Sequence, residues 1–78
     1  MAQTRSIRAI ALEILDNWHN VDPYAMPYLD AMLWLDNIED KYMFDSGRSI
    51  VLYFLSNASR WRGDVAKRIK AELKQLLK

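Results

Sequence analysis

The sequence predicts an all-α protein, a compact bundle of three to four helices that ends in an amphipathic basic C-terminal helix. Apolar residues recur every three or four positions through the second half of the chain, as they do on one face of a helix. Only two glycines and two prolines interrupt the 78 residues, and there is no cysteine to form a disulfide framework. We therefore expect a single helical domain over residues 1–78 that is stabilised by core packing.

The first predicted helix begins near Thr4 or Ser6, because either side chain can cap it, and ends at about Asn17 or His19. Pro23 follows shortly and cannot continue the helix. The apolar stripe of this helix repeats at helical spacing and consists of Ile7, Ile10, Ala11, Ile14 and Trp18.

A second helix is predicted from Pro27 to about Tyr42, after a short turn over residues 23–26. The turn is expected because Pro27 lacks the N–H group that a helix begun earlier would need. Leu29 and Leu33 give this helix a second apolar face among acidic residues. Two apolar faces indicate either a helix that sits between two others or a face that is reserved for a partner.

A third helix is expected to be capped by Asp45 or Ser46 and to be followed by a break. One continuous helix from there to residue 77 would be about 48 Å long, which exceeds the width of a domain of this size. Two junctions fit the sequence. In one, the helix ends at Asn57 and Ser59 caps the last helix; in the other, Gly63 ends the helix and Asp64 caps the next.

Charge is unevenly distributed along the chain, although the net charge is only +1. Residues 1–59 contain four basic and eight acidic residues, whereas residues 60–78 contain seven basic and two acidic ones. The lysines of the last helix recur three and four residues apart and form one cationic ridge, which consists of Lys67, Lys70, Lys74 and Lys78. Such a ridge can bind an acidic protein surface or a phosphate backbone. The alternative is a solvated helix face that binds no partner and places cations near the C-terminal end of the helix.

The predicted function is that of a small non-enzymatic protein-binding module with an acidic protein surface or a second copy as its partner. The candidate partner-binding residues are Arg60, Trp61, Arg62, Lys67, Lys70, Lys74, Leu29 and Leu33. Trp61 is either a core residue or, if exposed between its two arginines, an interface anchor. A homodimer would use Leu29 and Leu33. The alternative function is non-specific nucleic-acid binding through the same ridge, since a helix-turn-helix motif around Gly63 fits poorly.

Catalysis and metal binding find little support in the sequence. His19 is the only histidine, and there is no glycine-rich phosphate loop. Asp36, Glu39 and Asp40 lack the spacing of a calcium loop and are interpreted as a solvated acidic face. We therefore predict no catalytic residues, no metal site and no cofactor. No apolar run approaches the ~18 residues of a membrane span and no signal peptide is recognised, so a cytoplasmic protein without membrane contact is expected.

Part of the C-terminal half resembles small helical proteins encoded by bacteriophages. The resemblance rests on Asp45-Ser46-Gly47-Arg48-Ser49-Ile50-Val51, Trp61-Arg62-Gly63-Asp64 and Ile69-Lys70-Ala71-Glu72-Leu73-Lys74. It covers under half of the chain, and its last part is a generic amphipathic helix. It implies a compact accessory protein that docks on a host macromolecule.

Overall fold

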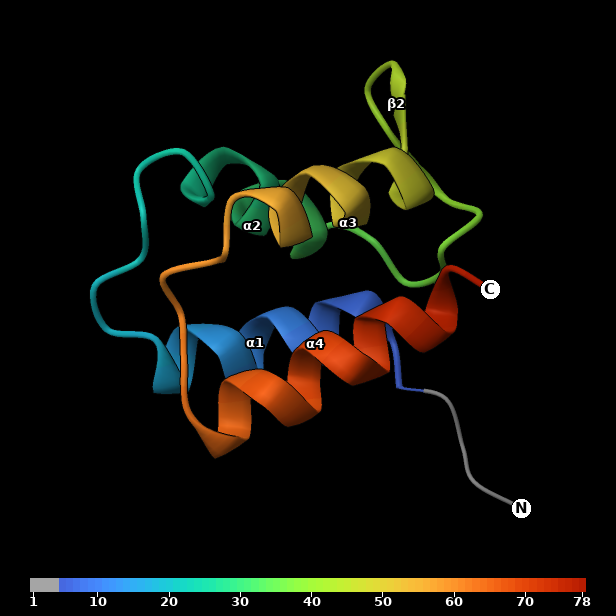
Figure 1. Cartoon of the computed structure of the whole chain (residues 1–78). Helices are drawn as coiled ribbons and strands as arrows, with labels where there is room; N and C mark the ends of the chain where they lie inside the picture. Colours follow the sequence, from blue (N-terminus) through green and yellow to red (C-terminus); the bar gives the residue numbers. More distant parts are fainter. Residues whose placement is uncertain (1–4) are drawn as a thin grey trace.

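Four helices and one two-stranded hairpin make up the computed structural model, which describes residues 5–78 (Figure 1). The elements in chain order are α1 (Ile7–Asn17), α2 (Met26–Met32), β1 (Lys41–Tyr42), β2 (Asp45–Ser46), α3 (Gly47–Ser56) and α4 (Asp64–Leu76). The prediction of a largely helical chain is confirmed. The hairpin was not predicted. Within the described part, no helix is long and apolar enough to cross a membrane.

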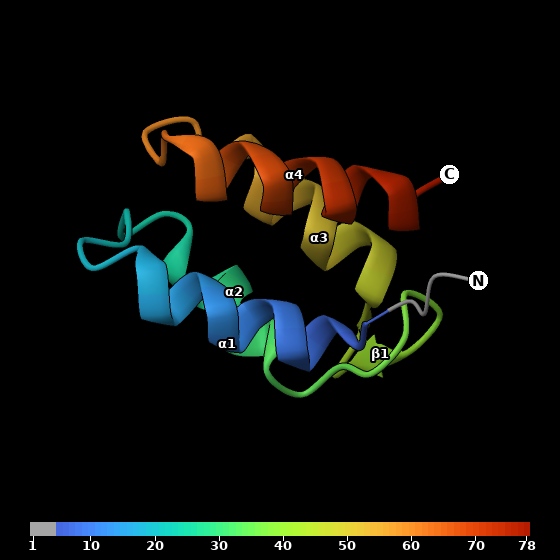
Figure 2. The same ribbon diagram turned by 90° about the horizontal axis from the view of Figure 1, so that it is seen from below.

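The helices surround one apolar core. In Figure 1, α2 and α3 lie above α1 and α4, and the view turned by 90° in Figure 2 places α3 and α4 on one side and α1 and α2 on the other. Each helix contributes fully buried side chains, among them Ile10 of α1, Met32 of α2, Phe54 of α3 and Ile69 of α4. The exposed candidate functional residues lie on α4 and on the connection that leads into it.

The start of α1 is fixed by a side-chain cap. Ser6 Oγ accepts a hydrogen bond from the N–H of Ala9 at 3.1 Å, which satisfies one of the free donors of the first turn. The helix ends at Asn17, and the N–H of Trp18 still donates to Ile14 O at 2.7 Å. The predicted cap Ser6 and the predicted end at Asn17 are confirmed. Thr4, the alternative cap, lies outside the described residues.

The predicted helix from Pro27 to Tyr42 is wrong beyond Met32, where α2 ends. The backbone that follows forms hydrogen bonds with the first turn of α1. Leu35 O and Asp36 O accept hydrogen bonds from the N–H groups of Arg8 and Ile7, each at 2.9 Å. These donors belong to the first turn of α1, where no intrahelical acceptor exists, so the chain after α2 satisfies them instead of continuing as a helix.

The connection from α3 to α4 agrees only in part with the two predicted junctions, since neither Ser59 nor Asp64 is the N-cap of the last helix. Helix α3 ends at Ser56, next to the predicted Asn57, while α4 begins at Asp64 with Gly63 as its N-cap. Gly63 has a φ of 112°, a backbone conformation that favours glycine. Between the helices, Ala58 and Trp61 are buried, so this connection packs against the core.

Candidate functional site

Two of the predicted partner-binding residues belong to the core, so the prediction that they contact a partner needs correction. Leu29 is fully buried, and Trp61 is only 5% exposed. Leu33 is half-buried and packs against the same core. Helix α2 contacts both α1 and α3. Its two apolar faces are therefore those of a helix between two others, and a homodimer through Leu29 would require the core to open.

Trp61 has a structural role that its sequence position only partly indicated. Its ring stacks on that of Trp18 at 5.5 Å between centroids and 9° between planes. Trp18 in turn packs edge-on against Phe54 at 6.2 Å. These aromatic contacts connect the end of α1, the middle of α3 and the connection to α4, and they add to the stabilisation that burial of the rings provides.

The predicted cationic ridge is mostly exposed, with one exception. Lys67, Lys74 and Lys78 are exposed, but Lys70 is half-buried and its Nζ donates a hydrogen bond to Trp61 O at 2.6 Å. Burial lowers the pKa of Lys70, and the positive charges of Lys74 and Arg62 lower it further. Lys70 therefore already makes a hydrogen bond within the molecule. The other three lysines are the better candidates for contact with an external partner.

Some of the basic residues near α4 already have carboxylate partners. Arg68 pairs with Glu13, and Arg60 Nε lies 3.8 Å from an Asp22 oxygen. Within residues 5–78, no carboxylate lies within 4.0 Å of the charged nitrogens of Arg62, Lys67, Lys74 or Lys78. The positive charge on the outer face of α4 is therefore not neutralised by the described part of the chain.

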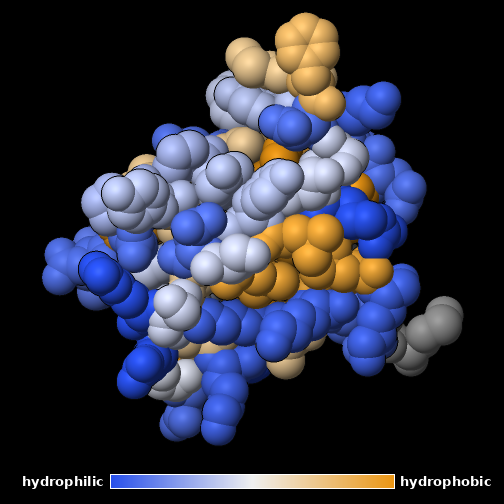
Figure 3. All heavy atoms as spheres, turned by 45° about the horizontal axis from the view of Figure 1, so that its top comes forward, coloured by the Kyte–Doolittle hydropathy of each residue, from blue (hydrophilic) through white to orange (hydrophobic). Residues whose placement is uncertain are grey.

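An apolar band borders these lysines. Arg48 Nη1 on α3 donates a hydrogen bond to Leu77 O, so the flank of α3 that carries Arg48 faces the C-terminal end of α4. Leu52 and Leu55 lie on that flank, four and seven residues further along, and Leu52 is 49% exposed. Figure 3 shows the result as an apolar band across the middle of this face, with a row of hydrophilic side chains along its lower edge.

The same spacing places the lysines opposite these leucines. On α4, Lys74 and Leu77 follow Lys70 by four and seven residues and share its flank. Leu77 and Leu55 are both half-buried against the core. The surface of α3 and α4 thus combines exposed or half-buried leucines with lysines, an arrangement that suits an apolar segment carrying negative charge.

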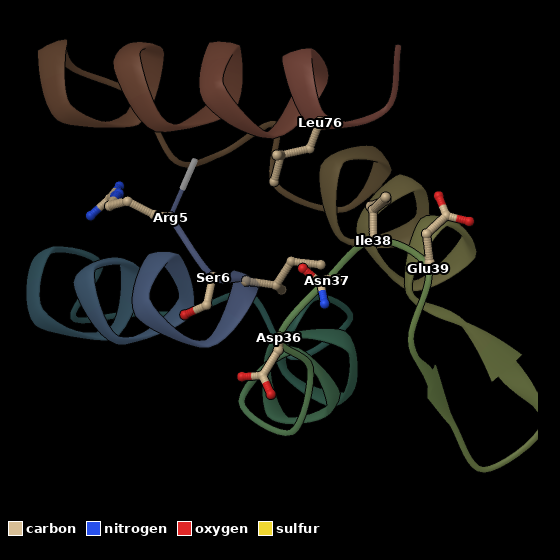
Figure 4. Close-up of a pocket in the computed structure, with 8 residues that line it drawn as sticks. Arg5, Ser6, Asp36, Asn37, Ile38, Glu39 and Leu76 are labelled. Carbon is tan, nitrogen blue, oxygen red and sulfur yellow. The ribbon is translucent and has the colours of Figure 1, made fainter. Parts of the chain in front are cut away.

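A larger surface hollow, of about 570 Å³, lies beside the C-terminal end of α4. It opens between the start of α1, residues 36–39 and the end of α4 (Figure 4). The cation at its edge, Arg5, is held by Glu72 and Glu13. Asp36 and Glu39 are the acidic residues in its lining, so this hollow does not extend the basic surface.

The smaller hollow lies at the start of α4 and measures about 210 Å³. Its lining joins one aromatic ring to several basic side chains and consists of Trp61, Arg62, Gly63, Ala66, Lys67 and Lys70. This is below the ~300 Å³ at which small-molecule sites begin, so the hollow suits a single side chain better than a cofactor.

The acidic residues around position 36 have a structural role. Asp40 Oδ2 accepts hydrogen bonds from the N–H groups of Asp36 and Asn37, both at 3.0 Å. These two bonds, that from Asn37 first, lower the pKa of Asp40. Among residues 5–78, no three histidine, aspartate or glutamate side chains come together as metal ligands would.

The sequence analysis missed an exposed apolar site at the tip of the hairpin. Phe44 is fully exposed and Met43 is 80% exposed. The hairpin itself was not predicted from the sequence. Two large apolar residues between charged neighbours, Lys41 and Asp45, are the signal that could have identified it.

Comparison with protein-family models, curated proteins and solved structures finds no match to this chain. The function therefore has to be inferred from the surface of the molecule. Its two distinctive features are the cationic face of α4 with the adjoining leucines and the apolar tip of the hairpin.

Proposed function

We propose that this chain is a small non-enzymatic protein-binding module that docks an acidic amphipathic segment of another protein between α3 and α4. The observation that carries the proposal is the band of Leu52, Leu55 and Leu77 together with Lys67 and Lys74, which pair with no carboxylate among residues 5–78. In this proposal the four helices act as a bundle, and α4 is its amphipathic basic helix. The bacteriophage resemblance adds that the partner is a host protein.

The apolar component favours a protein partner over nucleic acid. Covering an exposed leucine side chain such as that of Leu52 stabilises a complex by up to about 1.5–3 kcal/mol, and a sugar–phosphate backbone offers little apolar surface to do so. The lysines then provide steering and orientation, since exposed charges contribute more to specificity and association rate than to affinity. An amphipathic helix with leucines on one face and carboxylates beside them satisfies both components.

A labelled synthetic helix of that composition tests the proposal by fluorescence anisotropy. The variant Lys67→Glu/Lys74→Glu is expected to weaken binding by about tenfold or more, equivalent to about 1.4 kcal/mol. Leu52→Asp is expected to weaken it similarly, because a carboxylate would then lie in the apolar band. Lys70 is left unchanged because of its bond to Trp61 O.

Two controls separate local effects from general ones. Lys41→Glu reverses the charge of an exposed lysine on β1, away from α4, and should bind the peptide as the wild type does. A peptide with lysines in place of its glutamates should not bind. Equal binding of both peptides, or of Lys67→Glu/Lys74→Glu and the wild type, would reject the proposal.

Labelled duplex DNA serves as the test of the alternative function. Non-specific nucleic-acid binding predicts a complex at low salt that weakens steeply as salt rises and that Leu52→Ala, which leaves the charge unchanged, does not weaken. The protein-binding proposal predicts that the acidic peptide binds more tightly than the duplex at physiological salt. The reverse order of affinities would favour the nucleic-acid interpretation.

A further inference from the structure

The hairpin presents two large apolar side chains that contact little of their own chain. Strands β1 and β2 pair Tyr42 with Asp45, which leaves Met43 and Phe44 as a two-residue loop. Phe44 is 101% exposed, and Met43 is 80% exposed. The loop protrudes from the molecule in Figure 1 and forms the apolar projection at the top of Figure 3. Aromatic side chains exposed in this way are typical anchors of protein interfaces.

The base of the hairpin is held firmly, so that the tip has a defined position. Gly47 N donates to Asp40 O at 2.6 Å, closing the two ends of the hairpin together. At Gly47 a β-carbon would lie only 2.9 Å from Ile38 O, which shows how closely the two segments approach. Ser46, the last residue of β2, caps α3 by accepting from Ser49 N at 3.2 Å. A two-stranded hairpin is marginal by itself, and these contacts supply the missing support.

Met43 occupies a position where glycine would be less strained. Its φ is 58°, in the left-handed region that favours glycine, and within residues 5–78 it is the one non-glycine residue with a positive φ. A left-handed conformation costs an L-residue about 1–2 kcal/mol. The exposed methionine is not needed for the core, so its presence in a strained turn points to a contact outside the chain.

The surroundings of the tip are acidic. Residues 36–45 contain four carboxylates against a single cation, Lys41. Arg8 pairs with Asp36 and Arg48 pairs with Glu39, which leaves Asp40 and Asp45 as the carboxylates without an arginine partner within residues 5–78. Such a segment is repelled by phosphate groups of nucleic acid and by an anionic membrane surface. The surface that fits it is apolar at its centre and basic at its edge.

The smaller hollow at the start of α4 has these properties. Trp61 and Ala66 lie at its floor, where only 5% of Trp61 and 2% of Ala66 are exposed, and Arg62, Lys67 and Lys70 provide positive charge around it. A phenylalanine ring can pack against the accessible edge of an indole in such a hollow. The larger hollow is a poorer fit, because Asp36 and Glu39 line it and would repel the acidic hairpin.

We infer that Phe44 of one copy inserts into the hollow beside Trp61 of a second copy. In Figure 1 the hairpin stands at the upper right, and the segment that leads into α4 lies at the lower left, so the contact joins different molecules. The two surfaces are different, which makes the contact heterologous and leaves a free tip and a free hollow at the ends. Copies therefore assemble head to tail. Lys67 lines this hollow and also belongs to the proposed peptide site, so the assembly is tested at Phe44 and Arg62, which the peptide site does not use.

Sedimentation velocity over a concentration series tests the assembly. The wild type is expected to associate reversibly as its concentration rises, and added salt should weaken the association because opposite charges surround the contact. Phe44→Ala and Arg62→Glu should each reduce the association constant at least on the order of tenfold. Both residues are exposed, so the fold should be retained, which circular dichroism checks. Trp34→Ala removes an exposed ring elsewhere and should associate as the wild type does.

Mixing the two variants gives the decisive result. Phe44→Ala retains an intact hollow, and Arg62→Glu retains an intact tip, so an equimolar mixture should form a species of twice the monomer mass and no larger one. A wild type that stays monomeric at its highest soluble concentration would overturn the inference. A Phe44→Ala variant that still associates, or a mixture that stays monomeric, would also overturn it.

Discussion

Arg5 and Glu72 form a two-point ion pair between residues that lie 67 positions apart in the chain. Arg5 Nε donates to Glu72 Oε2 at 2.9 Å, and Arg5 Nη2 donates to Oε1 at 2.6 Å. Arg5 Nη1 also lies 2.7 Å from Glu13 Oε1. The hydrogen bond to Glu72 and the nearby carboxylates raise the pKa of Arg5, which keeps it charged. This cluster fastens the segment before α1 to the outer flank of α4.

Glu72→Gln is expected to lower stability, because it keeps the size of the side chain but removes the charge of the two-point pair. Both side chains are about one-third exposed, so solvent screens the pair and the expected loss is about 0.5–1 kcal/mol. Thermal unfolding should show a decrease in Tm of about 2–8 °C. Asp30→Asn, at an exposed position on α2, is the matched control. Equal Tm values for Glu72→Gln and this control would contradict the prediction.

Glu13 is expected to make the protein sensitive to acid. Hydrogen bonds from Arg68 and then from Arg5 lower the pKa of its carboxyl group from the ordinary value of 4.5. The folded state therefore binds fewer protons than the unfolded state at low pH. The contribution to stability is fully present above pH ~4.5 and is lost as the pH falls through the lower folded pKa.

Urea unfolding at a series of pH values measures this effect. The wild type should lose stability steadily below pH 4.5 through Glu13, whereas Glu13→Gln should start lower at neutral pH and lose less on acidification. An identical pH dependence for both proteins would assign the acid sensitivity to other carboxylates.

The sequence predicted those parts of the fold in which local signals and burial agree. The cap at Ser6 and the stripe of α1 are examples, because the apolar residues that repeat at helical spacing are also those that pack. It failed after Met32, since the carbonyls of Leu35 and Asp36 pair with donors of α1 that are distant in sequence. No local pattern reveals such a long-range hydrogen bond.

The candidate site was predictable to a similar extent. The lysine spacing on α4 placed Lys67 and Lys74 together on one exposed face. Leu52 was missed because its exposure depends on how far α3 lies from α4, which is a tertiary property. The sequence left open whether Trp61 belongs to the core or to an interface for the same reason. Its stacking on Trp18 places it in the core.

Trp61→Ala is expected to be strongly destabilising, because it removes a buried ring and leaves Trp18 without its stacking partner. Large aromatic truncations in cores cost about 3–5 kcal/mol, a large part of the ~5–15 kcal/mol that stabilises a small domain. Trp61→Phe should lose less. Trp34→Ala, at a side chain that is 71% exposed, should change stability by only about 0.5 kcal/mol. Chemical denaturation should therefore rank the three variants, and equal losses at positions 61 and 34 would contradict the burial of Trp61.

Gly47→Ala is expected to destabilise the protein although alanine favours helices. The new β-carbon would lie 2.9 Å from Ile38 O and 3.1 Å from Asn37 O, and backbone carbonyls cannot swing aside. The expected cost is about 1–3 kcal/mol in thermal unfolding. Gly63→Ala provides a contrast, since nothing lies within 4 Å of its β-carbon and only its φ of 112° opposes the substitution. Stabilisation by Gly47→Ala would show that the hairpin base is loose.

Met43→Gly is expected to change stability and self-association in opposite directions. Glycine relieves the left-handed conformation at φ 58°, and part of this gain is offset by the greater freedom of the unfolded chain, so stability should rise by about 0.5–1 kcal/mol. Association should weaken, because one of the two apolar side chains at the tip is lost. Met43→Ala shortens the same side chain without relieving the backbone, so it should weaken association with no gain in Tm. Thermal melts and sedimentation on the same samples measure both quantities. If Met43→Gly left association unchanged, Met43 would have no part in the contact, and its strained turn would serve only the hairpin.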